Sequence, residues 1–462
     1  MVNQLNDLMK ALEAGSYNAA PSSLQQGSAL QIEDLSPVME NVCFDDKQIK
    51  LQKMFSVKDA KGTLVQFNRQ LDYGIFGGSA QYEGGIGEED TSNYSRITIP
   101  MAYYSTVRRV SVAANLVAAF DGQKAETRAG NDAAIKLSAD IEFDGFRGQA
   151  DFSNSGVFDG NPAVIADVPG MQGVDMQVRL SDSLSNTQDL MFAEYGSNQT
   201  VVIAVNGTLT ESFIEDGAVK SAMNHGSADK LMLDPISLSA YNKIAHAKER
   251  IMLAGSAQEA MGANLRTQWT SNGTISLEPS RFLSGKTAPA RSRAGSPAAP
   301  ATVTPTAAND AASILAAGDY YYKATACNER GESVSTSSAQ VSPTAGQKVT
   351  LAIAAVTGCK YFNVYRSADG GTAAAAKFIG RVKASGSGAT SFVDLGFKEP
   401  GSVTGFLLQT NTFGFHQLAP YSRLKLALHD LSLPEAHFSF KCLAGYQPRK
   451  NVLFENISGQ LS

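Results

Sequence analysis

Acidic side chains cluster between residues 72 and 90, where their carboxylates could ligate calcium or act as a paired acid and base. The cluster consists of Asp72, Glu83, Glu88, Glu89 and Asp90. Carboxylates at the edge of a solvated loop more commonly meet the basic groups of a neighbouring molecule, and the exit of this loop carries Arg108 and Arg109. We therefore interpret both sets as contact residues, although the two arginines would also suit an ordinary solvated strand.

The other residues that could support catalysis or cofactor binding have unsuitable spacing. The histidines show neither HExxH nor HxxxH spacing, and the sequence contains no GxSxG or P-loop motif. The glycine run from Gly84 to Gly87 lacks the strand–turn–helix context of a phosphate-binding loop. We predict no catalytic residue, no metal site and no cofactor, and hence a protein that is not an enzyme. The histidines are His225, His246, His416, His429 and His437.

The acidic cluster belongs to a long glycine-rich connection between two strand-like segments, MFSVKD and MAYYSTVRRVSVAANL. Connections longer than about 12–15 residues without regular structure are usually functional or disordered. Ordering each backbone residue costs roughly 1–2 kcal/mol, yet the aromatic side chains make this segment too apolar for a free linker. We therefore predict a two-stranded arm that becomes ordered by lying on another subunit. The predicted contact residues are Tyr73, Phe76, Tyr82, Glu88, Glu89, Arg108 and Arg109.

Composition indicates a folded chain of two or three domains. Of the 462 residues, 43% are hydrophobic and 18% are charged, and the net charge is -5 with a pI near 5.7. This acidic balance disfavours a surface that grips nucleic acid directly. No apolar run reaches the roughly 20 residues of a membrane helix, and the N-terminus lacks the features of a secretory signal. We expect reduced cysteines, although a bond between Cys327 and Cys359 stays open.

A periodic pattern predicts a long helix over residues 126–150. Charged residues recur every four positions from Arg128 to Asp144 and form one solvated stripe. Apolar residues such as Leu137 and Ile141 fill a wide arc beside this stripe. A helix with a wide apolar arc and one solvated stripe is suited to lie across the face of a sheet.

Turn signals predict further elements between residues 154 and 284. Asn206-Gly207 and Asn272-Gly273 each lie between strand-like runs, which predicts two hairpins with type I′ turns. Asp234 and Pro235 predict the cap and the first turn of another helix. Trp269, ahead of the second hairpin, is assigned to the core.

Composition changes abruptly after residue 284. A Pro/Ala/Ser/Thr-rich linker is followed by short alternating segments such as YYYKATACNERGES, QKVTLAIAAV and FNVYRSADGG, which predict a small β-sandwich. The linker also carries Lys286, Arg291 and Arg293, which we interpret as solubilising residues rather than DNA contacts. After Gly401 the earlier sequence style returns. The sandwich is therefore an insertion whose two ends must emerge near each other.

The order of these pieces resembles the major capsid proteins of tailed double-stranded DNA bacteriophages, the Hong Kong 97-like fold. The resemblance rests on the glycine-rich loop, TVRRVSVAANL, the helix NDAAIKLSADIEFDGFRG, KLMLDPISLSAYNKIAHAKERI and the terminal FSFKCLAGYQPRKNVLFENISG. It implies an α+β fold with an N-arm, an extended loop, a spine helix and peripheral and axial domains, interrupted by an immunoglobulin- or fibronectin-like sandwich. The implied domains are 1–50 (N-terminal arm), 51–112 (extended loop, a β-hairpin), 113–284 (peripheral domain with the spine helix, and axial domain), 285–403 (linker and immunoglobulin-like sandwich) and 404–462 (C-terminal return to the core domain).

The resemblance implies a structural protein that self-assembles into the pentamers and hexamers of an icosahedral head enclosing double-stranded DNA. Its partners would be portal and scaffolding proteins and a cement protein, and its location the virion capsid, assembled in the host bacterial cytoplasm, with no membrane association. We expect no cleavage of an N-terminal scaffolding segment, because only residues 1–50 precede the loop. We also expect no lysine–asparagine cross-link. An encapsulin-type compartment and a surface adhesin with an immunoglobulin-like module are the alternatives; the insertion disfavours the first and the missing export signal the second.

Overall fold

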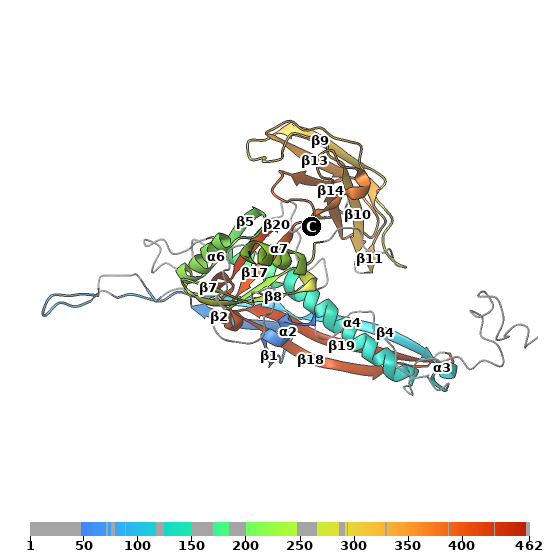
Figure 1. Cartoon of the computed structure of the whole chain (residues 1–462). Helices are drawn as coiled ribbons and strands as arrows, with labels where there is room; N and C mark the ends of the chain where they lie inside the picture. The colour runs from blue at the N-terminus through green and yellow to red at the C-terminus, as the bar shows by residue number, and fades with distance from the viewer. Residues whose placement is uncertain are drawn as a thin grey trace, which may run out of the picture.

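The structure is a computed structural model, and it describes residues 48–70, 73–74, 79–87, 89–116, 124–148, 170–183, 200–246, 266–285, 292, 294–328, 330–386, 388–428 and 430–458. The arm predicted over residues 1–50 lies almost entirely outside these ranges. The described chain forms an elongated body of sheets and helices and a separate unit built of strands (Figure 1). The predicted α+β class is confirmed.

A four-stranded sheet with the order β1-β18-β19-β4 forms one half of the body. Its strands are β1 (Ser56–Asp59), β18 (Phe413–Lys425), β19 (Ser432–Gly445) and β4 (Ala102–Ser111). The long helix α4 (Ala125–Arg147) lies across one face of this sheet, along β4 and β19 (Figure 1). The short helix α2 (Leu51–Met54) precedes β1 in the sequence, and the short helix α3 (Val112–Leu116) follows β4. The helix predicted over 126–150 is confirmed to within a few residues.

The predicted solvated stripe of α4 is wrong at its C-terminal end. Asp144 points into the body, where its Oδ2 accepts a hydrogen bond of 2.7 Å from the Tyr104 hydroxyl. The neighbouring Glu142 is fully buried, and its carboxylate accepts backbone N–H groups of Lys50, Leu51 and Gln52. Glu142 thereby fixes the start of α2 to α4, because a buried carboxylate needs such donors. Asp144 belongs to the four-residue charge period, and that period could not distinguish it from the exposed Asp132.

Burial makes Asp144 a source of pH-dependent stability. Desolvation raises its pKa from 3.8 to about 6, although the Tyr104 hydrogen bond opposes the shift. Between these pH values the folded state binds more protons than the unfolded state, so stability is lost as pH rises through 6. Asp144→Asn should therefore raise the free energy of unfolding by roughly 1–3 kcal/mol at pH 7.5 and have little effect near pH 4. Urea unfolding at both pH values, with Asp132→Asn on the exposed side of α4 as the control, tests this; equal effects at both pH values would contradict it.

A six-stranded sheet with the order β5-β20-β17-β6-β8-β7 forms the other half of the body. Its strands are β5 (Val202–Gly207), β20 (Val452–Ile457), β17 (Val403–Leu408), β6 (Lys230–Leu233), β8 (Gly273–Pro279) and β7 (Thr267–Thr270). Helices α6 (Glu211–Met223) and α7 (Pro235–His246) contribute to the core on one face, and α5 (Val174–Ser183) contributes to the core shared with α4. The Asp234 cap is confirmed, because Asp234 Oδ2 accepts the backbone N–H of Ile236 at 3.0 Å.

The first predicted hairpin is wrong, and the second is right with a different turn. Asn206 has a φ of 47° but lies within β5, which ends at Gly207 and pairs in parallel with β20, and the next helix or strand is α6. The buried Ile214, Ala218 and Ser221 follow the period of a helix. In the second hairpin β7 pairs with β8, but residues 271 and 272 lie at the turn and Gly273 carries the positive φ of 130°. A type I′ turn centred on Asn272-Gly273 is therefore wrong by one residue.

The separate unit consists of two sheets that enclose one hydrophobic core. The first sheet contains β9 (Val303–Asn309), β13 (Gln347–Ile353) and β16 (Thr390–Asp394). The second contains β10 (Tyr322–Asn328), β11 (Gly331–Glu332), β12 (Thr336–Ser337), β14 (Tyr361–Arg366) and β15 (Lys377–Lys383). We call this unit the sandwich. Its cysteines, Cys327 and Cys359, form no disulfide; its likeness to an immunoglobulin domain stays a prediction.

Candidate functional site

An extended hairpin leaves the body as a sheet of its own. Strands β2 (Leu64–Gln70) and β3 (Tyr94–Pro100) pair antiparallel from Leu64 with Pro100 to Gln70 with Tyr94. Within the described chain, neither strand pairs with any other strand. The described residues of the connection between them extend far beyond the body (Figure 1). A two-stranded hairpin alone is marginally stable in water, so its order depends on what it contacts.

Contacts with the body fix the base of the hairpin. Val65 and Ile99 pack with Met101, Cys442 and Ala444 in a small buried cluster. The Phe67 ring meets the Tyr446 ring edge-on at 5.2 Å between centroids. Arg69 Nη2 donates a hydrogen bond of 2.6 Å to the Gly445 carbonyl oxygen, and burial lowers the pKa of Arg69 to about 10. The direction in which the hairpin leaves the body is therefore set by packing and not by the hairpin alone.

Beyond its base the hairpin exposes large apolar side chains. Tyr82 is 95% exposed, Ile86 is 92% exposed and Tyr73 is 76% exposed. Removing such side chains from water is favourable by about 25 cal/mol per Å² of apolar surface. A projecting loop has no core of its own in which to bury them. The exposure is thus the expected signature of a surface that another molecule covers.

A second apolar surface lies on the four-stranded sheet, opposite α4. Tyr104 and Thr106 of β4 contact α4, so the alternate residues Tyr103 and Val107 face away from it. Both are more than half exposed, at 57% and 58%. On β19 the register places Phe440 opposite Tyr103, with their ring centroids 5.0 Å apart. We call this surface the apolar sheet face; its members are the exposed Tyr103, Val107 and Leu424 and the half-buried Phe438 and Phe440.

The residues predicted for contact fall into three groups. Tyr73, Tyr82 and Glu89 lie exposed on the loop, whereas Phe76 and Glu88 fall outside the described residues. Arg109 is exposed but already forms an ion pair with Asp430 of its own chain, at 3.1 Å. Arg108 is half-buried and lies opposite Glu435 in the register of β4 and β19. The structure therefore separates the loop residues from the two arginines, and a role for any of them in contact stays a prediction.

Sequence reasoning missed two exposed aromatic features. Trp269, assigned to the core, is 80% exposed on β7 at the edge of the six-stranded sheet. The error arose because a lone tryptophan before a strand carries no sign of which sheet face it joins. The apolar sheet face was also missed, although the alternation in HFSFK and AYYSTVRR contains it. Its residues come from β4, β18 and β19; β4 is far from the other two strands in sequence, and only the register of β4 with β19 joins it to them.

Neither metal ligation nor membrane crossing is indicated by the described residues. No cluster of three or more His, Cys, Asp or Glu side chains among them could hold a metal ion. No helix within the described ranges is both long and apolar enough to span a bilayer. The exposed apolar surfaces are therefore the features that call for a functional explanation.

Comparison with known proteins identifies similar solved structures but no sequence relative. No protein-family model and no curated protein sequence matches the chain. The capsid of a native GTA particle is 10% identical, with a TM-score of 0.49 over 96% of this chain and 100% of that one. The capsid of cyanophage P-SCSP1u is 10% identical, with a TM-score of 0.43 and coverage of 96% and 100%. An encapsulin complex from Synechococcus elongatus is 7% identical, with a TM-score of 0.36 and coverage of 92% and 95%. All three TM-scores lie below 0.5, so the function of this chain is inferred from its own geometry.

Proposed function

We propose that this chain is a shell subunit, the major capsid protein of an icosahedral phage head in which pentamers and hexamers enclose double-stranded DNA. The observation that carries the proposal is the hairpin formed by β2 and β3. Its base is fixed to the body, while its far part exposes Tyr73, Tyr82 and Ile86 to solvent. A segment with a set direction and an uncovered apolar surface suits a contact with an adjacent copy.

The apolar sheet face supplies a second surface for the same assembly. It lies on the body and not on the hairpin, so one copy can offer a hairpin to one neighbour and a sheet face to another. Contacts between two different patches are heterologous, and they generate closed rings when the rotation between copies is right. Many modest contacts of this kind stabilise a shell without any single tight interface.

The order of the elements supports the Hong Kong 97-like assignment. Among the described residues, the hairpin, the long helix, the helix-flanked sheet and the C-terminal strands follow one another in the order that the resemblance implies. In this assignment α4 is the spine helix of the peripheral domain, and the six-stranded sheet belongs to the axial domain. The sandwich is a decoration inserted between β8 and β17.

The DNA would be contained rather than bound by a specific surface. With a net charge of -5 the subunit offers little counter-charge to phosphate, so packaging would be driven by a separate motor through a portal. Scaffolding and cement proteins are the further partners of such a shell, which would assemble in the host cytoplasm and reside in the virion.

Electron microscopy of the purified protein tests the proposal. Expressed alone or with its scaffolding partner, the chain should form rings or closed particles under negative stain. Nucleic acid inside particles isolated from infected cells would support a phage head, whereas a protein cargo would support an encapsulin-type compartment. A strictly monomeric species at high protein concentration would contradict both.

Deleting the sandwich should leave assembly intact. The sandwich has its own core, and the two connections meet where Gly285 faces the carbonyl of Gly401. Joining residue 285 to residue 402 should therefore preserve the body and the yield of particles to within about twofold, because the removed unit has a hydrophobic core of its own. Particle yield by sedimentation is the measurement. Loss of soluble protein on deletion would show that the sandwich is part of the body's fold.

A further inference from the structure

Two connections join the sandwich to the body, and they run side by side. The outgoing connection passes through residues 283–285 and the returning one through residues 395–402. A Cβ on Gly285 would lie 2.5 Å from the carbonyl oxygen of Gly401, which shows how closely the two segments approach. We call residues 395–402 the strap. The connecting segments of a flexible tether would be solvated. The hydrogen bonds that these two segments make therefore decide whether the sandwich has a fixed orientation.

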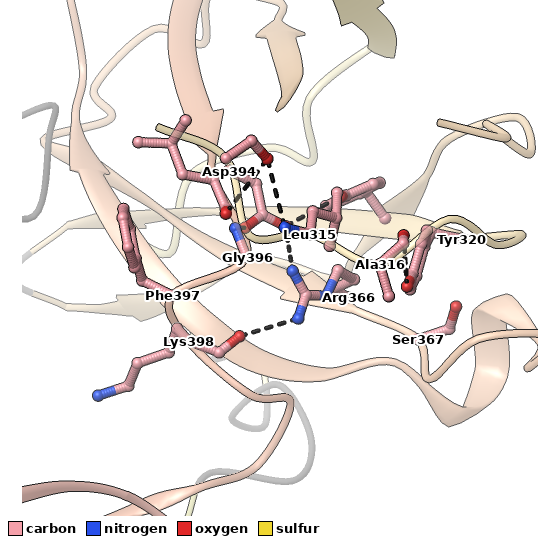
Figure 2. Close-up of polar contacts among 12 residues, drawn as sticks. Leu315, Ala316, Tyr320, Arg366, Ser367, Asp394, Gly396, Phe397 and Lys398 are labelled. Carbon is pink, nitrogen blue, oxygen red and sulfur yellow. Dashed lines mark hydrogen bonds and ion pairs between the residues drawn. The ribbon is translucent and has the colours of Figure 1, made fainter. Parts of the chain in front are cut away.

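Arg366 holds the strap from the sandwich side (Figure 2). Its guanidinium donates through Nη1 to Asp394 Oδ2 at 2.6 Å and through Nη2 to the Lys398 carbonyl oxygen at 2.9 Å. Asp394 also accepts the backbone N–H of Gly396 at 2.9 Å, which turns the chain as it leaves β16. Arg366 and Asp394 are both only 4% exposed. A buried, charge-assisted network of this kind is strong because water does not compete for its members.

Asn456 holds the same strap from the body side. It lies in β20, and its Nδ2 donates to the carbonyl oxygen of Phe397, the residue beside Lys398, and to Asn206 Oδ1 at 2.9 Å. Asn456 Oδ1 accepts the Ser402 hydroxyl at 3.3 Å. Asn456 adopts a left-handed φ of 55°, a conformation that costs a non-glycine residue energy. Its side chain therefore joins two points of the strap from a strained backbone position.

A third side chain fixes the outgoing connection. Arg147, at the end of α4, donates to the carbonyl oxygens of Leu283 and Ser284. The Ser284 hydroxyl in turn donates to Asp234, the residue that caps α7. Both connections are thus held by side chains from elements of the body.

We propose that the strap is a rigid mount that fixes the orientation of the sandwich relative to the body. Arg366 holds it from the sandwich side and Asn456 holds it from the body side. Pro400 within the strap removes further backbone freedom. Adjacent carbonyls, of Phe397 and Lys398, are bound from opposite sides, so a rotation of the sandwich must break at least one of the two hydrogen bonds. The inference concerns the single chain and does not depend on assembly into a shell.

Hydrogen–deuterium exchange of the full-length chain tests the mount, with Asn456→Gly as the decisive variant. Glycine accepts the left-handed backbone and removes only the side-chain clamp. His225→Gly, at an exposed residue with a φ of 60°, is the matched control. We expect slow exchange at residues 396–402 in the wild type, about tenfold faster exchange in Asn456→Gly, and no change there in the control.

Arg366→Lys and limited trypsin digestion provide an independent readout. Lysine keeps a positive charge for Asp394 but cannot bind the carboxylate and the Lys398 carbonyl together. Trypsin should cut after Lys398 slowly in the wild type and several-fold faster in both clamp variants. A wild-type strap that exchanges or is cut at the rate of an unstructured peptide would show a flexible tether. Wild-type rates in Asn456→Gly would exclude Asn456 as a clamp.

Discussion

Replacing residues 71–93 with a short Gly-Ser turn should abolish closed particles while leaving the subunit folded. The replaced segment carries the exposed Tyr73, Tyr82 and Ile86, whereas the ladder of β2 and β3 and its anchors at Phe67 and Arg69 remain. The free energy of unfolding should change by less than about 0.5 kcal/mol, because the lost side chains are solvated in the single chain. Sedimentation velocity measures the particles, and urea unfolding measures the fold.

Point variants separate the apolar contribution of the loop from its length. The double variant Tyr82→Ser and Ile86→Ser keeps every backbone atom of the hairpin and should raise the protein concentration needed for assembly by about tenfold or more. Val334→Ser, at a side chain that is 66% exposed on the sandwich, removes a comparable apolar side chain away from the proposed contacts. Normal particles from the replacement variant would show that assembly does not need residues 71–93, and would remove the observation on which the shell proposal rests.

Placing a charge on the apolar sheet face should block assembly as strongly as replacing residues 71–93. Val107→Asp keeps the subunit folded because Val107 is largely solvated, but it would bury an unpaired carboxylate wherever another copy covers this face. The cost is several kcal/mol per contact, so the concentration needed for assembly should rise by at least roughly 100-fold. Light scattering recorded over a series of protein concentrations measures the concentration at which assembly begins.

Val334→Asp on the sandwich is the matched control for that charge, and it should assemble normally. If Val107→Asp assembled like the control, the sheet face would be a solvent-exposed surface of the particle, and the hairpin would have to contact a different part of its neighbour. The two surfaces can therefore fail independently, which makes their roles separable.

The elements that the sequence predicted well are those set by local patterns. The helix over 126–150 follows from a continuous apolar arc, and α4 appears there as Ala125–Arg147. The Asp234 cap needs only the residues beside it, and Asp234 binds Ile236 and Ser237 as such a cap should. The break at residue 284 is compositional, and the sandwich follows it.

The errors arose where a distant partner decides the outcome. Asn206-Gly207 has the local chemistry of a hairpin turn, but β5 pairs with β20 from the far end of the chain, and α6 takes the place of the returning strand. The sequence pattern places Asp144 on a charged stripe, but in the fold Asp144 accepts a hydrogen bond from Tyr104 of β4. The apolar sheet face depends on the register between β4 and β19, which no local pattern contains. The hairpin was found because its glycines and aromatics are contiguous, whereas the surface on the sheet was not.

The topology of the body also sets the order in which a newly made chain can mature. β19 is an inner strand of the four-stranded sheet, and β20 is an inner strand of the six-stranded sheet. These two strands are the last in the sequence. The sandwich, whose strands run from Val303 to Asp394, can fold on the ribosome before either strand has been synthesised. The body cannot close until both have emerged, so the hairpin's anchor at Gly445 and the apolar sheet face are completed last. In the proposed shell, a nascent subunit would therefore lack a completed apolar sheet face and a completed hairpin anchor until β19 has been synthesised.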